Sequence, residues 1–174
     1  HGVLHKALKQ AVLIGYLRAN PTEACILPRI IRKEMHPLEE EQVAVFLREV
    51  QGHPHEYLYK IALFTGLREG EVLGLGWEHI DFQTGTLTVK RQLRREQKKG
   101  GGYYFSPPKN NKSRCLTLAP SVIQLFRLQK LEQNSMRMEG GDAWEEHGLI
   151  FTNQTGGYLS YRTVYDCFKR IVRN

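Results

Sequence analysis

The stretch that decides the fold reads Thr65-Gly66-Leu67-Arg68-Glu69-Gly70-Glu71-Val72-Leu73-Gly74-Leu75. We expect one helix to end at Thr65-Gly66 and a second, short helix to follow over about 69–75. Arg68 then lies at the start of the second helix. A guanidinium there can bind a phosphate with two hydrogen bonds. Glu71 lies on the same helical face and can orient that guanidinium. A surface Arg–Glu pair of little energetic value is the alternative that physics alone leaves open.

The segments on either side predict an α+β fold that is mostly helical, with a small antiparallel sheet. Apolar residues at helical spacing predict helices over 3–17, after Pro37, over 55–64, over about 120–131 and from Ser160 onward. Alternating and apolar runs predict strands over 86–93, 116–118 and 149–151. The glycine-rich stretch 98–102 is expected to be a flexible hairpin tip. A basic stretch with prolines and no periodicity predicts a linker, with a domain boundary near residue 34.

The positive charge of the chain is concentrated in one segment. The 174 residues carry a formal net charge of +7, and residues 91–114, with eight basic residues and one acid, account for all of the excess. The basic residues are Arg91, Arg94, Arg95, Lys98, Lys99, Lys109, Lys112 and Arg114. Such a patch indicates a polyanion, most simply nucleic acid, although a solvated loop has the same composition. The aromatic residues at 103–105 either stack on bases or anchor the hairpin to the core, and we expect anchoring.

Composition argues against several other classes of protein. The three cysteines, Cys25, Cys115 and Cys167, are odd in number and far apart, which excludes a disulfide framework and a CxxC metal site and favours a reducing cytoplasm. No stretch approaches the roughly 20 apolar residues of a membrane span, so we expect no membrane partner. The sequence His53-Pro54-His55 has no third ligand nearby and is typical of a turn.

Several segments, taken together, resemble the tyrosine recombinases, the phage integrase family. Thr-Gly-Leu-Arg-x-x-Glu at 65–71, followed by residues 75–82, resembles the first active-site box of that family. Residues 107–114 resemble the β-hairpin that carries its catalytic lysine. Residues 149–151, Gly156-Gly157 and the helix from Ser160 are similar to the segment before its second box. These segments follow the order of the family over nearly the whole chain.

The resemblance implies both a fold and a reaction. The fold is the end of a helical core-binding domain over 1–33, followed by the first part of the recombinase catalytic domain over 34–174. In the reaction, a tyrosine hydroxyl attacks a DNA phosphate, which forms a 3′-phosphotyrosine link and frees a 5′-hydroxyl. No metal or other cofactor is expected, because the covalent intermediate keeps the bond energy. The expected partner is double-stranded DNA, bound by a tetramer of the full-length protein near the bacterial nucleoid, with no small-molecule substrate.

The resemblance also implies roles for particular residues. Arg68 matches the first catalytic arginine, which would hold a non-bridging oxygen of the scissile phosphate, and Glu71 matches the acidic position that supports it. Lys109 matches the hairpin lysine that protonates the leaving 5′-oxygen. Because residues 109–118 are about one residue shorter than the family pattern, Lys112 competes for this role, and Lys98 and Lys99 are weaker candidates. The residues expected to bind DNA are Arg91, Arg94, Lys98, Lys99, Lys112 and Arg114.

The second box of the family, His-x-x-Arg, has no counterpart in the chain, since none of the seven histidines has an arginine three positions later. Tyr158, Tyr161 and Tyr165 precede the place where that box would begin, so none matches the nucleophile, and the last two are expected to pack. The chain begins with His1 and lacks a helix stop at its end. We therefore expect a piece of a longer recombinase that is inactive by itself. A non-catalytic DNA-binding relative is the alternative, whereas an RNA-binding module lacks its usual aromatic and GxxG signatures.

Overall fold

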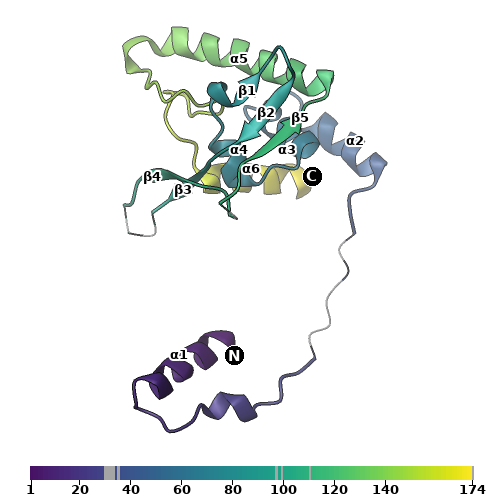
Figure 1. Ribbon diagram of the computed structural model, residues 1–174. Coiled ribbons are helices and arrows are strands. Elements are labelled where there is room, and N and C mark those ends of the chain that lie inside the picture. The colour runs from purple at the N-terminus through teal and green to yellow at the C-terminus, as the bar shows by residue number, and fades with distance from the viewer. Residues whose placement is uncertain (30–33, 35, 97, 99, 110, 174) are drawn as a thin grey trace. The chain divides into compact units, whose positions relative to one another are not determined.

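The computed structural model describes residues 1–29, 34, 36–96, 98, 100–109 and 111–173 of the chain (Figure 1). The chain divides into two compact units, His1–Pro37 and Leu38–Asn174. This division falls close to the boundary expected from the basic linker. The assignment of the first unit to a core-binding domain stays a prediction.

The first unit consists of helix α1 (Gly2–Leu13) and a 3-10 turn η1 (Pro21–Ala24). Helix α1 ends four residues before the expected end, and Gly15 follows it with a left-handed φ of +84°. The side chain of Asn20 accepts a hydrogen bond from the backbone N–H of Thr22 at 3.1 Å, and its amide donates to the carbonyl of His5 at 3.1 Å. One buried asparagine therefore both caps η1 and ties it to α1.

The second unit contains five α-helices among the residues that the structure describes. They are α2 (Glu40–Glu49), α3 (Glu56–Thr65), α4 (Glu69–Leu73), α5 (Pro120–Gly140) and α6 (Tyr161–Arg173), with 3-10 turns η2 (Trp77–His79) and η3 (Gly141–Ala143). Helix α5 runs nine residues past the expected end. Of the helices so described, none is both long and apolar enough to cross a bilayer. Ile61 of α3 and Phe126 of α5 are fully buried, and they belong to the core between the helices and the sheet.

The strands form two small antiparallel sheets. The first has the order β1 (Ile80–Asp81), β2 (Thr86–Val89), β5 (Arg114–Thr117), and the second pairs β3 (Gln92–Arg95) with β4 (Tyr103–Ser106). The single strand expected over 86–93 is therefore wrong in detail, because the chain leaves one sheet after Val89 and enters the other at Gln92. The strand expected over 149–151 is also wrong, since those buried residues form only one isolated bridge, between Gly76 and Leu149.

Helix α4 and strand β3 approach each other unusually closely. A Cβ atom on Gly74 would lie 2.7 Å from the backbone nitrogen of Leu93, and one on Gly70 would lie 3.1 Å from the carbonyl oxygen of the same residue. Glycine at both positions lets the strand rest directly on the helix. This contact brings β3 beside the segment that contains Arg68.

Candidate active site

The local sequence fixes the position of Arg68. Helix α3 ends at Gly66, whose left-handed φ of +63° is one that glycine adopts without strain, and its N–H donates to the carbonyl of Ala62 at 3.0 Å. Leu67 is buried and anchors the connection. Arg68 then takes an extended conformation immediately before α4. Its side chain is consequently directed outward from a fixed point between two helices, with 61% of its surface exposed.

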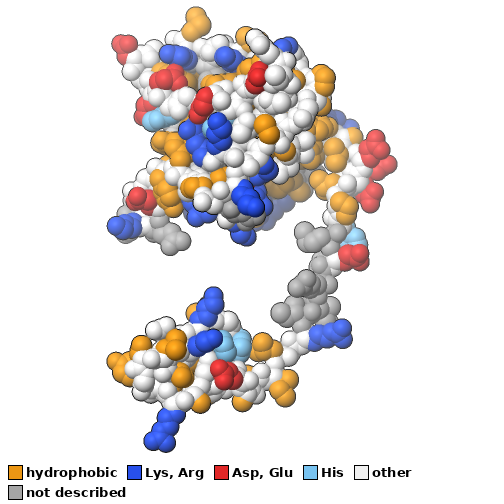
Figure 2. All heavy atoms as spheres, viewed as in Figure 1, with side chains coloured by type: hydrophobic (Ala, Val, Ile, Leu, Met, Phe, Trp, Pro, Cys, Tyr) orange, Lys and Arg blue, Asp and Glu red, His pale blue; other side chains and the backbone are white. Residues whose placement is uncertain are grey.

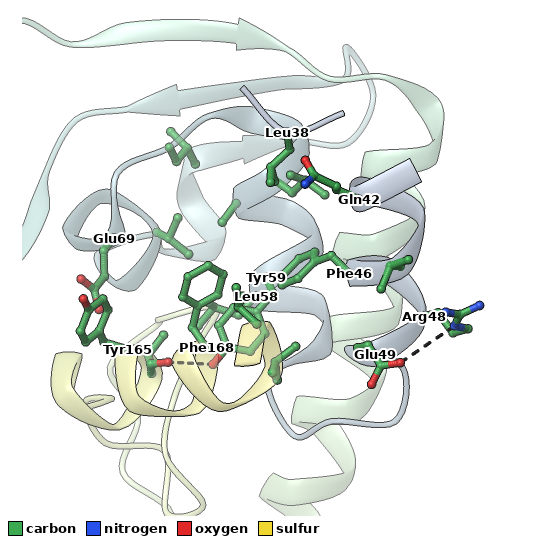
Figure 3. Close-up of a pocket in the computed structure, with 18 of the residues that line it drawn as sticks. Leu38, Gln42, Phe46, Arg48, Glu49, Leu58, Tyr59, Glu69, Tyr165 and Phe168 are labelled. Carbon is green, nitrogen blue, oxygen red and sulfur yellow. Dashed lines mark hydrogen bonds and ion pairs between the residues drawn. The ribbon is translucent and has the colours of Figure 1, made fainter. Parts of the chain in front are cut away.

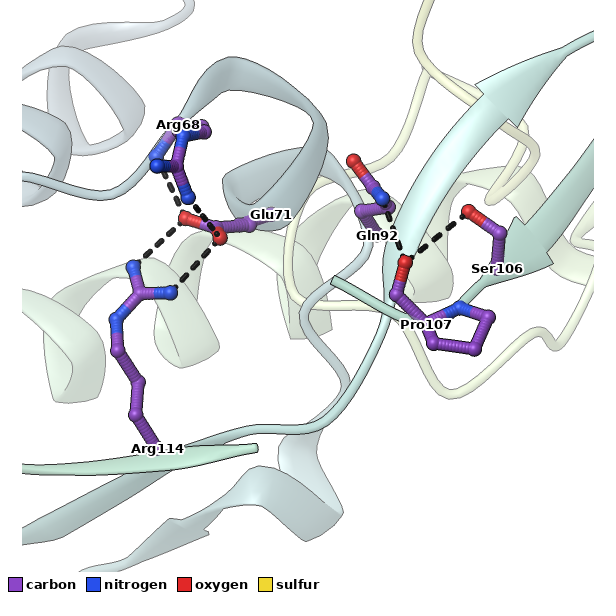
Figure 4. Close-up of polar contacts among 6 residues, drawn as sticks. All are labelled: Arg68, Glu71, Gln92, Ser106, Pro107 and Arg114. Atoms are coloured by element: carbon purple, nitrogen blue, oxygen red, sulfur yellow. Dashed lines mark hydrogen bonds and ion pairs between the residues drawn. The ribbon is translucent and has the colours of Figure 1, made fainter. Parts of the chain in front are cut away.

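Glu71 is the centre of a three-residue polar cluster formed by Arg68, Glu71 and Arg114 (Figure 4). One carboxylate oxygen accepts from the backbone N–H of Arg68 at 2.9 Å, and the other accepts from its Nη1 at 3.2 Å. Arg114 approaches the same carboxylate from β5, and its Nη1 and Nη2 each donate to one oxygen at 2.8 Å. The Glu71 side chain is only 1% exposed, so the carboxylate is held below the surface with both oxygens bonded.

The electrostatics of the cluster follow from these contacts. The hydrogen bonds from Arg114 are the main cause that lowers the pKa of Glu71 to about 2, with further contributions from Arg68, and they outweigh the opposing effect of burial. The same contact raises the pKa of Arg114. At neutral pH one carboxylate therefore faces two guanidinium groups, and the cluster carries one net positive charge close to the surface.

The candidate lysines lie on the connection between β4 and β5. The side-chain amide of Gln92 donates to the carbonyl of Pro107 at 2.6 Å, and the N–H of Asn111 donates to the carbonyl of Pro108 at 2.8 Å. Lys109 lies in a turn beside these bonds and is exposed. Lys112 is exposed as well, and neither lysine forms an ion pair with any residue that the structure describes. Both ammonium groups are thus free to bind an anion, and both lysines remain candidates for the role of the hairpin lysine.

A polar hollow of about 620 Å³ lies beside Arg68. It combines guanidinium groups with aromatic rings, and its lining includes Arg68, Arg94, Arg95, Tyr103, Tyr104, Tyr161 and Arg162. Arg162 lies outside the basic segment, so sequence reasoning missed it, and no local pattern indicated it. The hydroxyl of Tyr161 donates to the carbonyl of Leu93, and burial, followed by the charge of Glu69, raises its pKa to about 12. Tyr161 is therefore a neutral packing residue, as expected, whereas Tyr165 is half-exposed.

The remaining residues of the basic segment differ in their exposure and in their contacts within the protein. Arg91 donates from Nε to the carbonyl of Gly74 at 3.0 Å, pairs with Glu78 at 3.0 Å and lies over the ring of Phe105. Lys98 is exposed, and Lys99 lies outside the described residues. Figure 2 shows Lys and Arg side chains near β3 and β4 and at the outer end of that hairpin. The anchoring expected of the aromatic run is confirmed for Tyr103, whose ring stacks on Tyr158 at 5.5 Å.

A second hollow, of about 820 Å³, is mostly apolar and lies between α2, α3, α4 and α6 (Figure 3). Phe46, Leu58, Tyr59 and Phe168 face it, and Phe46 and Phe168 meet edge to face at 5.9 Å. Most of its lining is apolar, although Gln42 and Arg48 also line it. Among the described residues, no group of three or more His, Cys, Asp or Glu side chains could hold a metal ion.

Comparisons with known proteins identify the family to which the chain is related. The phage integrase family matches residues 16–174. The chain is 27% identical to a protein named tyrosine recombinase XerC-like of Caldanaerobacter subterraneus, over 93% of this chain and 46% of that protein. It is also 27% identical to an integrase of Streptomyces ambofaciens, over 100% of this chain and 45% of that protein.

Solved structures give the same result. The Tn1549 transposon integrase in complex with transposon right end DNA is similar with a TM-score of 0.76 and 26% identity, over 97% of this chain and 54% of that one. The chain spans about half the length of the relatives that it matches. Because the family match covers nearly the whole sequence, the chain belongs to the phage integrase family of tyrosine recombinases.

Proposed function

We propose that the chain belongs to a site-specific DNA recombinase or integrase of a phage or mobile element, and that it binds double-stranded DNA and holds the scissile phosphate. One observation carries this proposal. Arg68 has an exposed guanidinium, yet a buried carboxylate fixes its position and a second arginine leaves the cluster positively charged. The names of the relatives, and the transposon DNA bound to the Tn1549 integrase, support DNA as the partner.

The proposed chemistry divides between two kinds of side chain. In the cleavage step a tyrosine hydroxyl loses its proton and its oxygen bonds to the phosphorus. The bond from phosphorus to the 5′-oxygen breaks, and the 5′-oxygen takes up a proton. Arg68 donates hydrogen bonds to a non-bridging oxygen, where negative charge grows in the transition state. Lys109, or Lys112 in its place, supplies the proton to the leaving oxygen. The tyrosine itself has no counterpart among the matched residues.

The other basic residues contribute charge rather than chemistry. Arg94 lines the hollow beside Arg68, and Lys98 is exposed at the end of the β3–β4 hairpin, so both are suited to contacting DNA phosphates. Arg91 already has internal partners and is expected to contribute less, while Lys99 keeps its predicted role. We expect binding of the 174 residues in the non-specific range of about 10⁻⁴–10⁻⁶ M, falling steeply with salt.

We further propose that the 174 residues bind DNA without cleaving it, because they contain no His-x-x-Arg motif. Catalytic groups that act as a unit are strongly non-additive, so Arg68 and Lys109 alone give no measurable cleavage. The tetramer implied by the resemblance, and a cytoplasmic location at the nucleoid, stay predictions. A suicide substrate with a nick, followed by a denaturing gel, tests the inactivity, and a covalent protein–DNA band would contradict it.

The test of the main proposal compares Arg68→Ala with Arg137→Ala. Arg137 is a matched control, since its side chain is 60% exposed and pairs with an exposed glutamate on the surface. In a recombinase that carries these residues together with the second box and the tyrosine, Arg68→Ala should lower cleavage by about 10²-fold or more, and Arg137→Ala should not. Affinity for DNA should change little in either variant, because many phosphate contacts share the binding. No binding to any duplex at low salt would refute the proposal.

A further inference from the structure

Arg114 was expected to bind DNA, and in the structure its guanidinium contacts Glu71. Both of its terminal nitrogens donate to Glu71 at 2.8 Å, which is the planar two-bond arrangement that arginine forms with carboxylates. Arg68 makes only one side-chain bond to the same group, and that bond is longer, at 3.2 Å. The main partner of Glu71 is thus Arg114, which lies 43 residues away in the sequence, and not its helical neighbour.

The direction of the Arg114 side chain follows from the register of the sheet. Arg114 pairs with Val89 and Leu116 pairs with Leu87, and both partners on β2 are fully buried. Side chains alternate between the two faces of a strand, so Arg114 and Leu116 share the face that packs on the core. The guanidinium therefore ends at the buried carboxylate (Figure 4), and only 37% of the side chain is exposed.

This arrangement changes what Arg68 can do. A carboxylate that faced Arg68 alone would compete with a phosphate for the same guanidinium and would cancel its charge. Because Arg114 occupies both oxygens of Glu71, Arg68 uses one terminal nitrogen there, and its Nε and Nη2 donate to no acceptor among the described residues. We propose that Arg114 is a positioning residue, which saturates Glu71 so that Arg68 presents a free guanidinium edge to a DNA phosphate. This inference rests on the function proposed above.

The test uses second-site rescue. Arg114→Gln should weaken the binding of inorganic phosphate at Arg68, followed through the NMR signal of its Nε–H group, by about tenfold, because Glu71 then turns to Arg68. The double variant Glu71→Gln/Arg114→Gln removes the competing carboxylate and should restore most of that binding. Arg114→Lys keeps the charge but not the two-bond geometry. Its affinity for phosphate should therefore lie between those of Arg114→Gln and the wild type. Arg137→Gln serves as the control and should leave the signal unchanged.

The outcomes separate the possible roles of Arg114. If the double variant binds phosphate again, Arg114 acts by positioning. If Arg114 instead contacted the phosphate directly, removing Glu71 would not replace that contact and binding would stay weak. A double variant as weak as Arg114→Gln overturns the inference and assigns Arg114 to the DNA. If Arg114→Gln does not fold, the same comparison is made with Arg114→Lys and Glu71→Gln/Arg114→Lys. A wild-type chain that binds neither inorganic phosphate nor a DNA duplex contradicts the proposed function itself.

Discussion

Glu71 should make the stability of the Leu38–Asn174 unit depend on pH in the acid range. Its pKa is about 2 in the folded chain, against an ordinary value of 4.5. A group whose pKa is depressed by folding contributes stability that is fully present above its unfolded pKa and is lost as the pH falls through its folded pKa. The difference of about 2.5 units corresponds to roughly 3 kcal/mol. Since the side chain is 1% exposed, screening by solvent reduces this figure little.

The assay compares urea unfolding of the wild type and of Glu71→Gln from pH 7 to about 2.5, followed by tryptophan fluorescence. The difference between the two free energies of unfolding isolates Glu71, because the glutamine does not titrate. That difference should shrink by about 2.5 kcal/mol between the two ends of the pH range, most of it below pH 4.5. The control is Glu146→Gln, which removes the ion pair between Glu146 and Arg137. The side chain of Arg137 is 60% exposed and that of Glu146 is 57% exposed. This substitution should therefore change the free energy of unfolding by less than about 1 kcal/mol at every pH.

The reasoning fails if the difference between wild type and Glu71→Gln is constant across this range while both chains fold. In that case, protonation of Glu71 would not lower the free energy of unfolding, although its carboxylate is buried against two guanidinium groups. If Glu71→Gln does not fold, a carbon-13 NMR titration of Glu71 in the wild type measures the same quantity. A midpoint near the ordinary value of 4.5 would be equally decisive against the argument.

The other predictions address packing, a buried hydroxyl and DNA binding. Gly74→Ala places a methyl group 2.7 Å from the backbone nitrogen of Leu93 and should cost about 1–3 kcal/mol in thermal unfolding, whereas Gly102→Ala, with no atom within 4 Å, should cost under about 1 kcal/mol. Tyr161→Phe leaves the carbonyl of Leu93 without its donor and should cost about 1–3 kcal/mol. In an ultraviolet titration, the wild type should show a tyrosine that ionises near pH 12, and this step should be missing from the variant. Lys98→Ala should weaken binding to all DNA sequences alike and lower the salt slope by about one, measured by fluorescence anisotropy, and a change confined to one base position would contradict this.

Local sequence patterns predicted those parts of the molecule that depend on near neighbours. The existence of the helices around α2, α3 and α6 follows from the spacing of apolar residues, and the end of α3 follows from Gly66. The contact between Arg68 and Glu71 also follows, because residues three apart on a helix face one another. Family membership was indicated in the same way, by short motifs in a fixed order, and the family match confirms it.

Details that depend on strand pairing were not accessible to such patterns. The run from Thr86 to Leu93 is continuous as a sequence pattern, but the chain divides it between two sheets, because β2 finds its partner in β5 and β3 finds its partner in β4. The alternation of Arg114 with Leu116 and Leu118 was a usable signal that Arg114 faces the core. It did not reveal what Arg114 would meet there.

The sequence by itself determined the class of fold, the family and the position of Arg68 beside its acidic neighbour. Only the tertiary structure decided that Glu71 is buried and that Arg114, 43 residues away, takes both of its oxygens. The physical reason is that burying a carboxylate is costly unless hydrogen-bond donors or positive charges replace its hydration, and these come from whichever segments the fold brings to it. Here that segment is the first residue of β5, placed against α4 by the register of a strand pair.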